Sequence, residues 1–163
     1  MFLRNIIKWN KKFYPSVKNN FIMRQRMFST NSTSTDDNKP MTQNLNTLFN
    51  TFSDHWSPKI AGEINNMHLK LVKVQGDFVW HHHDVEDELF LVTKGQLKMK
   101  IKDPVERVEI VNQGEYIIIP KKVEHCPCAD EECEIILLEP KTTLNTGNVK
   151  DDEKTVKDLD SVI

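Results

Sequence analysis

The chain has 163 residues, of which 38% are hydrophobic, so it is long enough for one domain with a substantial core. Three cysteines are too few, and odd in number, for a disulfide framework. No run approaches the roughly 18–20 apolar residues that span a bilayer. We therefore expect a single domain that is stabilised by its own core and has no membrane partner.

The formal net charge of −2 conceals a strong asymmetry along the chain. Residues 1–35 contain seven basic side chains and no acidic one. If the chain is cleaved near Phe28, the remainder keeps 15 basic and 24 acidic residues, a net charge of −9. Nucleic-acid binding requires clustered Lys and Arg. This acidic body therefore argues against a nucleic-acid partner.

A basic, acid-free N-terminus with interspersed apolar residues is typical of a mitochondrial transit peptide. Residues 2–9 can form an amphipathic helix with Phe2, Ile6 and Trp9 on its apolar face, and residues 26–30 resemble a matrix-peptidase cleavage site. We therefore predict a disordered presequence and a location in the mitochondrial matrix.

We assign residues 1–35 to this presequence, and the alternative is a disordered basic tail produced by Asn-rich low complexity. A secretory signal is disfavoured because no compact apolar core of 7–15 residues is present.

Residues 42–58 predict a short helix followed by an anchor. Apolar residues recur at helical spacing at Leu45, Leu48, Phe49 and Phe52. The predicted helix covers residues 42–53 and cannot continue through Pro58, and Trp56 is expected to pack on the body.

Residues 59–140 read as short strands separated by turns, with no helical interruption. The expected strands are 67–74, 78–83, 88–93, 96–102, 107–111, 115–119, 123–126 and 133–139. About eight strands at this spacing predict an all-β antiparallel sandwich, jelly roll or barrel. Residues 141–163 form a polar C-terminal tail that we expect to lie on the surface or to fray.

The densest chemical signal is the run His81-His82-His83. On a strand, residues two apart share a face, so His81 and His83 point inward with Val79 while His82 points outward. A hairpin through the acidic turn Asp84–Asp87 would bring Glu88 beside the two imidazoles. Such nitrogen and oxygen donors suit a divalent first-row metal.

Two spaced motifs resemble the cupin superfamily. They are Gly76…His81-x-His83-x4-Glu88-x6-Gly95 and Gly114-x5-Pro120-x4-His125. The resemblance covers residues from about 64 to 140 and is greatest to small single-domain cupins of the mannose-6-phosphate-isomerase-like group. It implies a jelly-roll β-barrel that binds one metal through His81, His83, Glu88 and His125.

The chain departs from the family pattern at three positions. Gly76 stands four rather than five residues before His81, Lys122 takes the place of a frequent Gly, and Ala129 that of a frequent Asn. These departures affect turn shape and the surroundings of the ligands, and they leave the four ligand positions unchanged.

The resemblance implies one divalent transition metal, which could be Fe, Mn, Zn or Ni, because imidazole and carboxylate suit all of them. We therefore expect a metal-dependent oxygenase or isomerase acting on a small polar metabolite, and the alternative is a non-catalytic module that binds a metal or a small ligand. No general base is identified, since Glu124, Tyr116 and Lys122 are candidates only by proximity in sequence.

We assign no role at the metal site to the remaining histidines, the cysteines and the outward-facing apolar residues. We expect His55 and His68 at the surface, and the three cysteines as buried free thiols: Cys126, Cys128 and Cys133. Leu89, Leu91 and Ile118 alternate opposite to the inward residues, so an apolar outer face remains for a second sheet or a partner. We therefore expect a homodimer.

The predicted presequence can be tested by fusing residues 1–40 to a fluorescent protein. We expect the fusion to accumulate in mitochondria, because a basic amphipathic helix is drawn inward by the membrane potential. The matched control changes Arg4, Lys8, Lys11 and Lys12 to Gln and should remain cytosolic. A diffuse cytosolic signal from the unchanged fusion would contradict the prediction.

Overall fold

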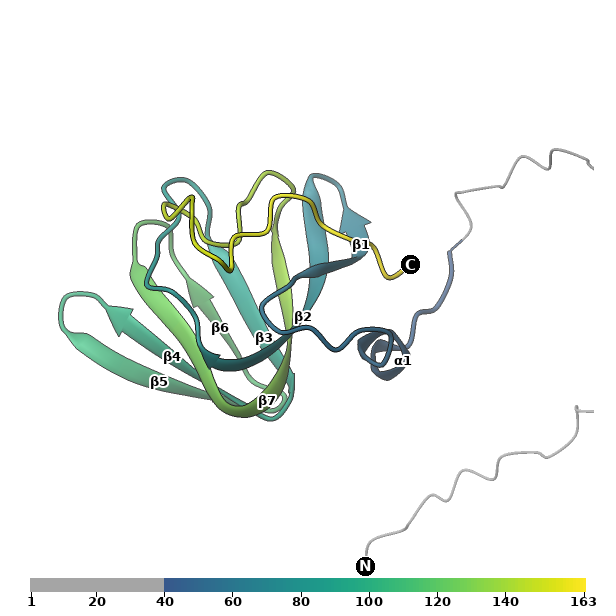
Figure 1. Ribbon diagram of the computed structural model, residues 1–163, viewed down its shortest axis with the longest axis horizontal. Coiled ribbons are helices and arrows are strands. Elements are labelled where there is room, and N and C mark those ends of the chain that lie inside the picture. The colour runs from purple at the N-terminus through teal and green to yellow at the C-terminus, as the bar shows by residue number, and fades with distance from the viewer. Residues whose placement is uncertain (1–39) are drawn as a thin grey trace, which may run out of the picture. The chain divides into compact units, whose positions relative to one another are not determined.

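The computed structural model describes residues 40–163, so the predicted presequence lies outside the described residues. These residues form one short helix and seven strands, and the strands pair antiparallel (Figure 1). The elements are α1 (Leu45–Phe49), β1 (Lys59–Ile64), β2 (Met67–Asp77), β3 (Glu88–Lys94), β4 (Gln96–Lys102), β5 (Glu106–Asn112), β6 (Tyr116–Ile119) and β7 (Glu124–Pro140). The prediction of an all-β barrel with a short N-terminal helix is confirmed.

The long strand β7 organises the sheet, whose order is β1-β2-β7-β3-β6. The first part of β7, near His125, pairs with β4, and its second part, near Leu137, pairs with β3. β2 pairs with β7 from Met67 to Asp77, and β5 extends the sheet beyond β4. β7 therefore contributes to both halves of the barrel and curls the sheet around one interior.

Several predicted strands differ from the structure. Residues 123–126 and 133–139 are parts of one strand, β7, and β2 continues through the expected turn at Gly76 to Asp77. β1 was not predicted, because its six residues are interrupted by Gly62 at a register shift that hides the alternation.

The expected strand at residues 78–83, which we call the histidine segment, is irregular. It pairs with β7 at a single bridge between His81 and His125. The amide of Phe78 donates to the carbonyl of Pro127 at 2.9 Å, but proline has no N–H to return, so the ladder is interrupted there. The segment still runs beside the barrel and delivers its side chains to the interior.

Two apolar clusters stabilise the barrel, one inside it and one on its outer face. The interior cluster includes Phe90, Leu97, Met99 and Ile135, all nearly inaccessible to solvent. The outer cluster lies under α1, where Leu48 and Phe49 cover Leu71 of β2 and Ile136 of β7 (Figure 1). Leu91 also packs against this outer cluster, so α1 already covers part of the apolar face that we assigned to a partner.

The helix α1 is shorter than the predicted range of residues 42–53. Asn44 caps it, because its side-chain oxygen accepts from the amide of Thr47 at 3.1 Å, and Asn50 ends it. Trp56 packs against the interior cluster, as expected for the anchor.

The C-terminal tail, which was expected to lie on the surface or to fray, is mostly exposed or half-buried but does not fray. Thr143, Asn145 and Thr146 are buried, and the end of the tail is tied to β1 by hydrogen bonds from Ile60 N to Asp160 O and from Val162 N to Ile60 O. The polar composition is compatible with burial because local hydrogen bonds satisfy the polar groups, as the side chain of Asn145 does with the backbone of residues 154 and 156.

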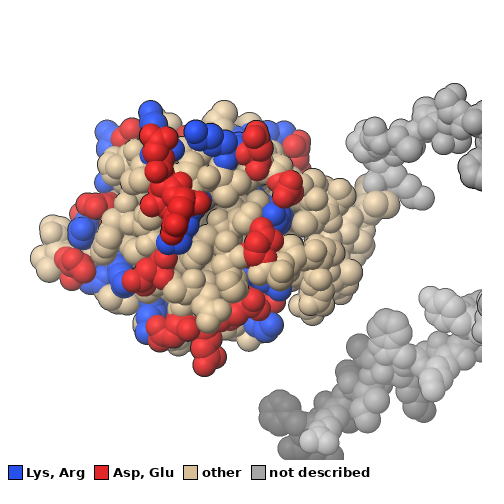
Figure 2. All heavy atoms as spheres, viewed as in Figure 1, with Lys and Arg blue, Asp and Glu red and all other residues tan. Residues whose placement is uncertain are grey.

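The described residues are acidic overall, with 14 basic and 22 acidic side chains, a net charge of −8. Figure 2 shows Asp and Glu gathered in a band across one face, with Lys and Arg mostly beside them. Within residues 40–163, no helix is long and apolar enough to cross a membrane. All three cysteines are free and buried, as expected.

Replacing Phe49 by Ala tests whether α1 is an integral part of the domain. The Phe49 side chain is only 1% exposed, so its loss should lower the free energy of unfolding by about 3–5 kcal/mol. Urea denaturation measures this loss. The control Leu45→Ala, at a half-exposed position of the same helix, should lower it by less than about 1 kcal/mol. A loss of less than about 1 kcal/mol for Phe49→Ala would show that α1 does not stabilise the barrel.

Candidate metal centre

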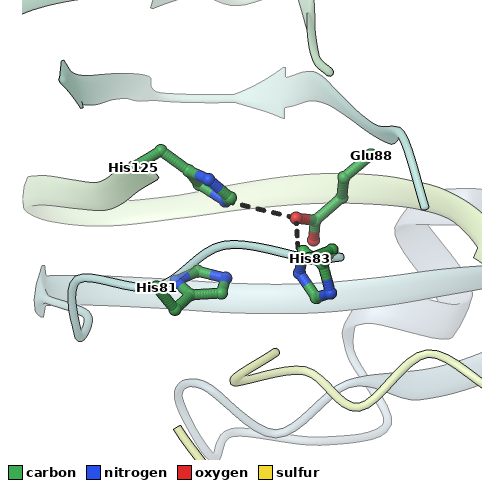
Figure 3. Close-up of side chains that lie close together, drawn as sticks. All are labelled: His81, His83, Glu88 and His125. Atoms are coloured by element: carbon green, nitrogen blue, oxygen red, sulfur yellow. Dashed lines mark ion pairs between the residues drawn. The ribbon is translucent and has the colours of Figure 1, made fainter. Parts of the chain in front are cut away.

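The structure brings His81, His83, Glu88 and His125 together at one end of the barrel interior (Figure 3). Glu88 opens β3, His125 lies near the start of β7, and the other two belong to the histidine segment. All four side chains are buried, and one donor atom from each lies within 4.8 Å of the others. The four residues singled out in the sequence therefore form one group.

Backbone carbonyls orient two of the imidazoles. Nδ1 of His81 lies 3.0 Å from the carbonyl of Val79, and Nδ1 of His125 lies 3.0 Å from that of Val123. A carbonyl oxygen only accepts, so both Nδ1 atoms carry the proton and donate. The neutral rings therefore present the Nε2 lone pair to the centre of the group, which is the form that binds metals.

The atoms that face one another lack hydrogen-bond partners among the described residues. They are Nε2 of His81, His83 and His125 and Oε2 of Glu88. Glu88 Oε2 stands 3.2 Å from His83 Nε2 and 3.3 Å from His125 Nε2, but neither contact has hydrogen-bond geometry (Figure 3). Buried polar atoms without partners cost free energy, and a shared cation would satisfy all four.

The spacing of the four atoms also fits one ion. Two ligands at about 2.1 Å from the same metal stand at most about 4.2 Å apart, and these atoms are already within 4.8 Å of one another. This group of three imidazole nitrogens and one carboxylate oxygen could hold a divalent transition metal.

Backbone hydrogen bonds fix the histidine segment against the barrel. His81 and His125 exchange amide-to-carbonyl bonds of 3.0 and 2.9 Å, and the amide of Lys122 donates to the carbonyl of His83 at 2.7 Å. Lys122 has a φ of 68°, in the left-handed region that favours glycine. Lys122 therefore adopts a backbone conformation that a glycine would adopt more readily.

The charges within the group favour an ionised Glu88. Burial opposes the charge, but the contacts with His125 and His83 outweigh it and lower the pKa of Glu88 to about 2. Burial would lower the pKa of His83, yet its contact with Glu88 raises it above the ordinary value. Burial, with the nearby His125, lowers the pKa of His81 to about 4, so this ring is neutral near pH 7.

A second buried ionic contact, which we did not predict, lies beside the group. Lys70 of β2 donates to Glu139 of β7 at 2.6 Å, and both side chains are fully buried. Burial and the nearby charge of Glu88 raise the pKa of Glu139 to about 7, although Lys70 opposes this. The alternation of side chains along β2 does predict that Lys70 is buried, because Lys70 lies on the same inward face as Val72 and Val74.

An apolar cavity of about 30 Å³ adjoins His81 and Glu88. The remaining residues that line it are Trp56, Pro58, Val72, Val74, Phe78, Phe90, Pro127, Ile135, Leu137 and Asn145. Trp56 stacks on Phe78 with 4.8 Å between ring centroids, and the ring of His81 meets Phe78 edge-on at 5.3 Å. Aromatic rings therefore enclose one side of the candidate metal centre.

The candidate general bases do not join this group. Tyr116 is 64% exposed, Lys122 is exposed, and Glu124 lies 3.5 Å from Lys102 at the surface. Glu139 is the carboxyl group that sequence reasoning missed, since nothing local marks it as facing the centre.

Of the other three histidines, His82 and His55 lie where the sequence predicted and His68 does not. His82 points away from the group towards Asp84, as expected. His55 is exposed and pairs with Glu132, but the expectation of a surface His68 is wrong, because this side chain is buried and lies 3.4 Å from Glu63. The strand period of β2 turns His68 inward beside Lys70.

The acidic turn before Glu88 is largely solvent-exposed, as predicted. Asp87 has one structural role, since it accepts the amide of Lys121 at 2.9 Å. This bond joins the turn to the loop that precedes His125.

Comparison with known proteins agrees with this arrangement. A family model described as a cupin domain matches residues 68–139. YdbB of Bacillus subtilis is 30% identical over 83 residues, which are 51% of this chain and 72% of YdbB.

Two solved structures are also similar. A cupin-2 domain containing protein from Shewanella frigidimarina has 44% identity and a TM-score of 0.58, over 61% of this chain and 94% of that chain. A protein from Neisseria meningitidis has 27% identity and a TM-score of 0.56, over 62% of this chain and 100% of that one.

The low pKa of His81 predicts a dependence of stability on pH in metal-free protein. The folded value of about 4 lies below the ordinary 6.5, so the unfolded chain takes up a proton first as pH falls, and stability is lost between these values. Between pH 7 and pH 5, chelator-treated wild type should lose about 2 kcal/mol more unfolding free energy than His81→Asn.

Urea denaturation at the two pH values measures this difference. The control His55→Asn removes an exposed ring away from the group and should follow wild type. Equal losses in wild type and His81→Asn would contradict the assignment of a buried neutral ring.

Proposed function

Since this chain belongs to the cupin family and is a small single-domain member of it, we propose that it is a metal-dependent enzyme acting on a small molecule. The proposed ligands of one divalent metal are His81, His83, Glu88 and His125. The observation that carries the proposal is the convergence of four buried donor atoms that lack hydrogen-bond partners among the described residues.

The donor set leaves several metals possible. Three imidazoles and one carboxylate suit Fe, Mn, Zn and Ni. When bound, Fe(II) would supply oxygen activation, and the other metals would supply Lewis-acid polarisation of a substrate oxygen. These alternatives correspond to an oxygenase and an isomerase.

The protein's own residues would orient the substrate and manage protons. Trp56 and Phe78 provide an apolar wall beside His81, which would exclude water and bind the hydrocarbon part of a substrate. We therefore revise the expected polar metabolite to a small molecule with an apolar side and oxygen donors. Glu139, with a pKa of about 7, is suited to hold a proton near the centre.

A non-catalytic binding module is the second candidate function. The cavity beside the centre has a volume of about 30 Å³, which is the share of one water molecule in the liquid. A cavity this small beside His81 and Glu88 does not hold a metabolite together with a metal, which supports a module that stores or senses the metal.

We also propose a location and an oligomeric state for this protein. The basic, acid-free residues 1–35 support import into the mitochondrial matrix. A homodimer is supported by exposed apolar side chains around an open cleft of about 660 Å³ between β5 and β6, including Ile110 and Ile118.

Anaerobic reconstitution tests the enzyme proposal. Protein lacking residues 1–28 is loaded with Fe(II), Mn, Zn or Ni, and metal content is measured beside a His81→Ala, Glu88→Ala double variant. We expect about one metal per wild-type chain and almost none in the double variant. Equal metal content in both proteins would disprove the site.

Activity is then measured on a panel of small phenols, hydroxy acids and keto acids. An oxygenase should show substrate-dependent O2 uptake with Fe(II), and an isomerase should convert substrate without O2 uptake. The double variant is the control for free metal. Metal binding without turnover of any compound would favour the binding module.

A further inference from the structure

The C-terminal strap, residues 141–149, lies beyond the stretch that the family model matches, yet it contacts the candidate metal centre. It follows β7 and crosses the end of the barrel where the histidine segment lies (Figure 1). Asn145 of the strap lines the same cavity as His81 and Glu88. The sequence predicted that this strap lies on the surface or frays, so its contact with the candidate metal centre requires a physical explanation.

Two hydrogen bonds join the strap to the residue between the two histidine ligands. The amide of His82 donates to the side-chain oxygen of Asn148 at 2.9 Å, and the amide of Asn148 donates to the carbonyl of His82 at 3.0 Å. Within the described residues, these are the hydrogen bonds that the His82 backbone makes. One asparagine therefore replaces the partner strand that the histidine segment lacks on this side.

The barrel holds the histidine segment from the other side. His81 exchanges backbone bonds with His125, and the carbonyl of His83 accepts from Lys122. The backbone groups of successive residues point to opposite sides of an extended chain. His81 and His83 are thus tied to the barrel, His82 is tied to the strap, and the segment is fixed between them.

Gly147 allows the strap to approach this closely. A Cβ at this position would lie 2.2 Å from the carbonyl oxygen of His82 and 3.3 Å from Cδ2 of His81, and the φ of 51° is left-handed. Any side chain here would displace the backbone of the histidine segment or the imidazole of His81. The contact therefore acts directly on the position of a proposed ligand.

Residues 154–156, which follow the strap, hold it in place through hydrogen bonds. The side chain of Asn145 donates to the carbonyl of Lys154 at 2.8 Å and accepts from the amide of Val156 at 2.9 Å. Thr146, fully buried, lies 2.9 Å from the hydroxyl of Thr155. The position of Asn148 is therefore set by residues 143–156 and not by His82 alone.

We propose that Asn148 is a positioning residue for the metal centre, and that Gly147 provides the space for it. This inference rests on the metal site of the proposed function. The amide side chain of Asn148 holds the backbone of His82, and His82 sets the directions of His81 and His83. Residues outside the common family domain thereby complete the site.

The test measures metal affinity in the full chain with Asn148→Ala and Asn148→Asp. Zn²⁺ affinity is determined by chelator competition, and ligand geometry by the visible absorption of the Co²⁺ form. We expect Asn148→Ala to weaken Zn²⁺ binding about tenfold and to alter the Co²⁺ spectrum. Asn148→Asp keeps the acceptor oxygen and should restore affinity to within about threefold of wild type.

Asn46→Ala is the matched control, since Asn46 is an exposed asparagine of α1, a helix that packs on the outer cluster. It should bind Zn²⁺ as wild type does. Gly147→Ala provides a second, steric perturbation and should weaken binding more than Asn148→Ala. The thermal midpoint of each chelated protein shows that the variants are folded when affinity is measured.

The outcomes separate this inference from the proposed function. If wild type binds no Zn²⁺ or Co²⁺, the metal site is disproved and the inference fails with it. If wild type binds metal and Asn148→Ala binds it equally well with the same spectrum, the inference alone is overturned. If Asn148→Ala and Asn148→Asp are equally weak, the hydrogen bond to His82 is not the cause and the inference is also overturned.

Discussion

Four polar atoms are buried away from water in the interior of the small barrel, and the rest of the structure depends on how they are satisfied. Three imidazole nitrogens and one carboxylate oxygen face one another in a buried volume, and the described residues offer them no hydrogen-bond partners. Removing such groups from water costs several kcal/mol unless a partner replaces the lost solvation. The remote ring nitrogens of His81 and His125 are satisfied by carbonyls, so only the inward atoms are left unpaired. A divalent cation bound between them would satisfy all of them at once.

The positions of the four proposed ligands depend on two different kinds of support. Glu88 and His125 lie on strands, where Glu88 of β3 pairs with Ile119 of β6 and His125 of β7 pairs with Ile101 of β4. His81 and His83 lie on an irregular segment that has only one bridge to the barrel. Irregular backbone requires other partners for its amides and carbonyls, and these come from Lys122 on one side and Asn148 on the other. A rigid ligand set is thus produced without a continuous strand.

The polar end of the barrel extends beyond the four proposed ligands. Lys70 and Glu139 form a fully buried ion pair whose charges act on Glu88. Burial and the negative charge of Glu88 disfavour a second carboxylate nearby, so the pKa of Glu139 is raised to about 7. Two buried carboxyl groups in different charge environments therefore lie close together in the barrel interior. An apolar wall of Trp56 and Phe78 completes the surroundings.

The fold class could be predicted from strand alternation, and the four residues of the candidate centre from the resemblance of two spaced motifs to the cupin pattern. Alternation placed His81 and His83 on one face and excluded His82, and the structure agrees. Which segments close the site depends on tertiary contacts. His82 and Asn148 are 66 residues apart, and the buried partner of Lys70 is 69 residues away, so no local pattern reveals either contact. A polar tail satisfies its hydrogen bonds equally well in water, and only its approach to the barrel end, permitted by Gly147, makes burial favourable.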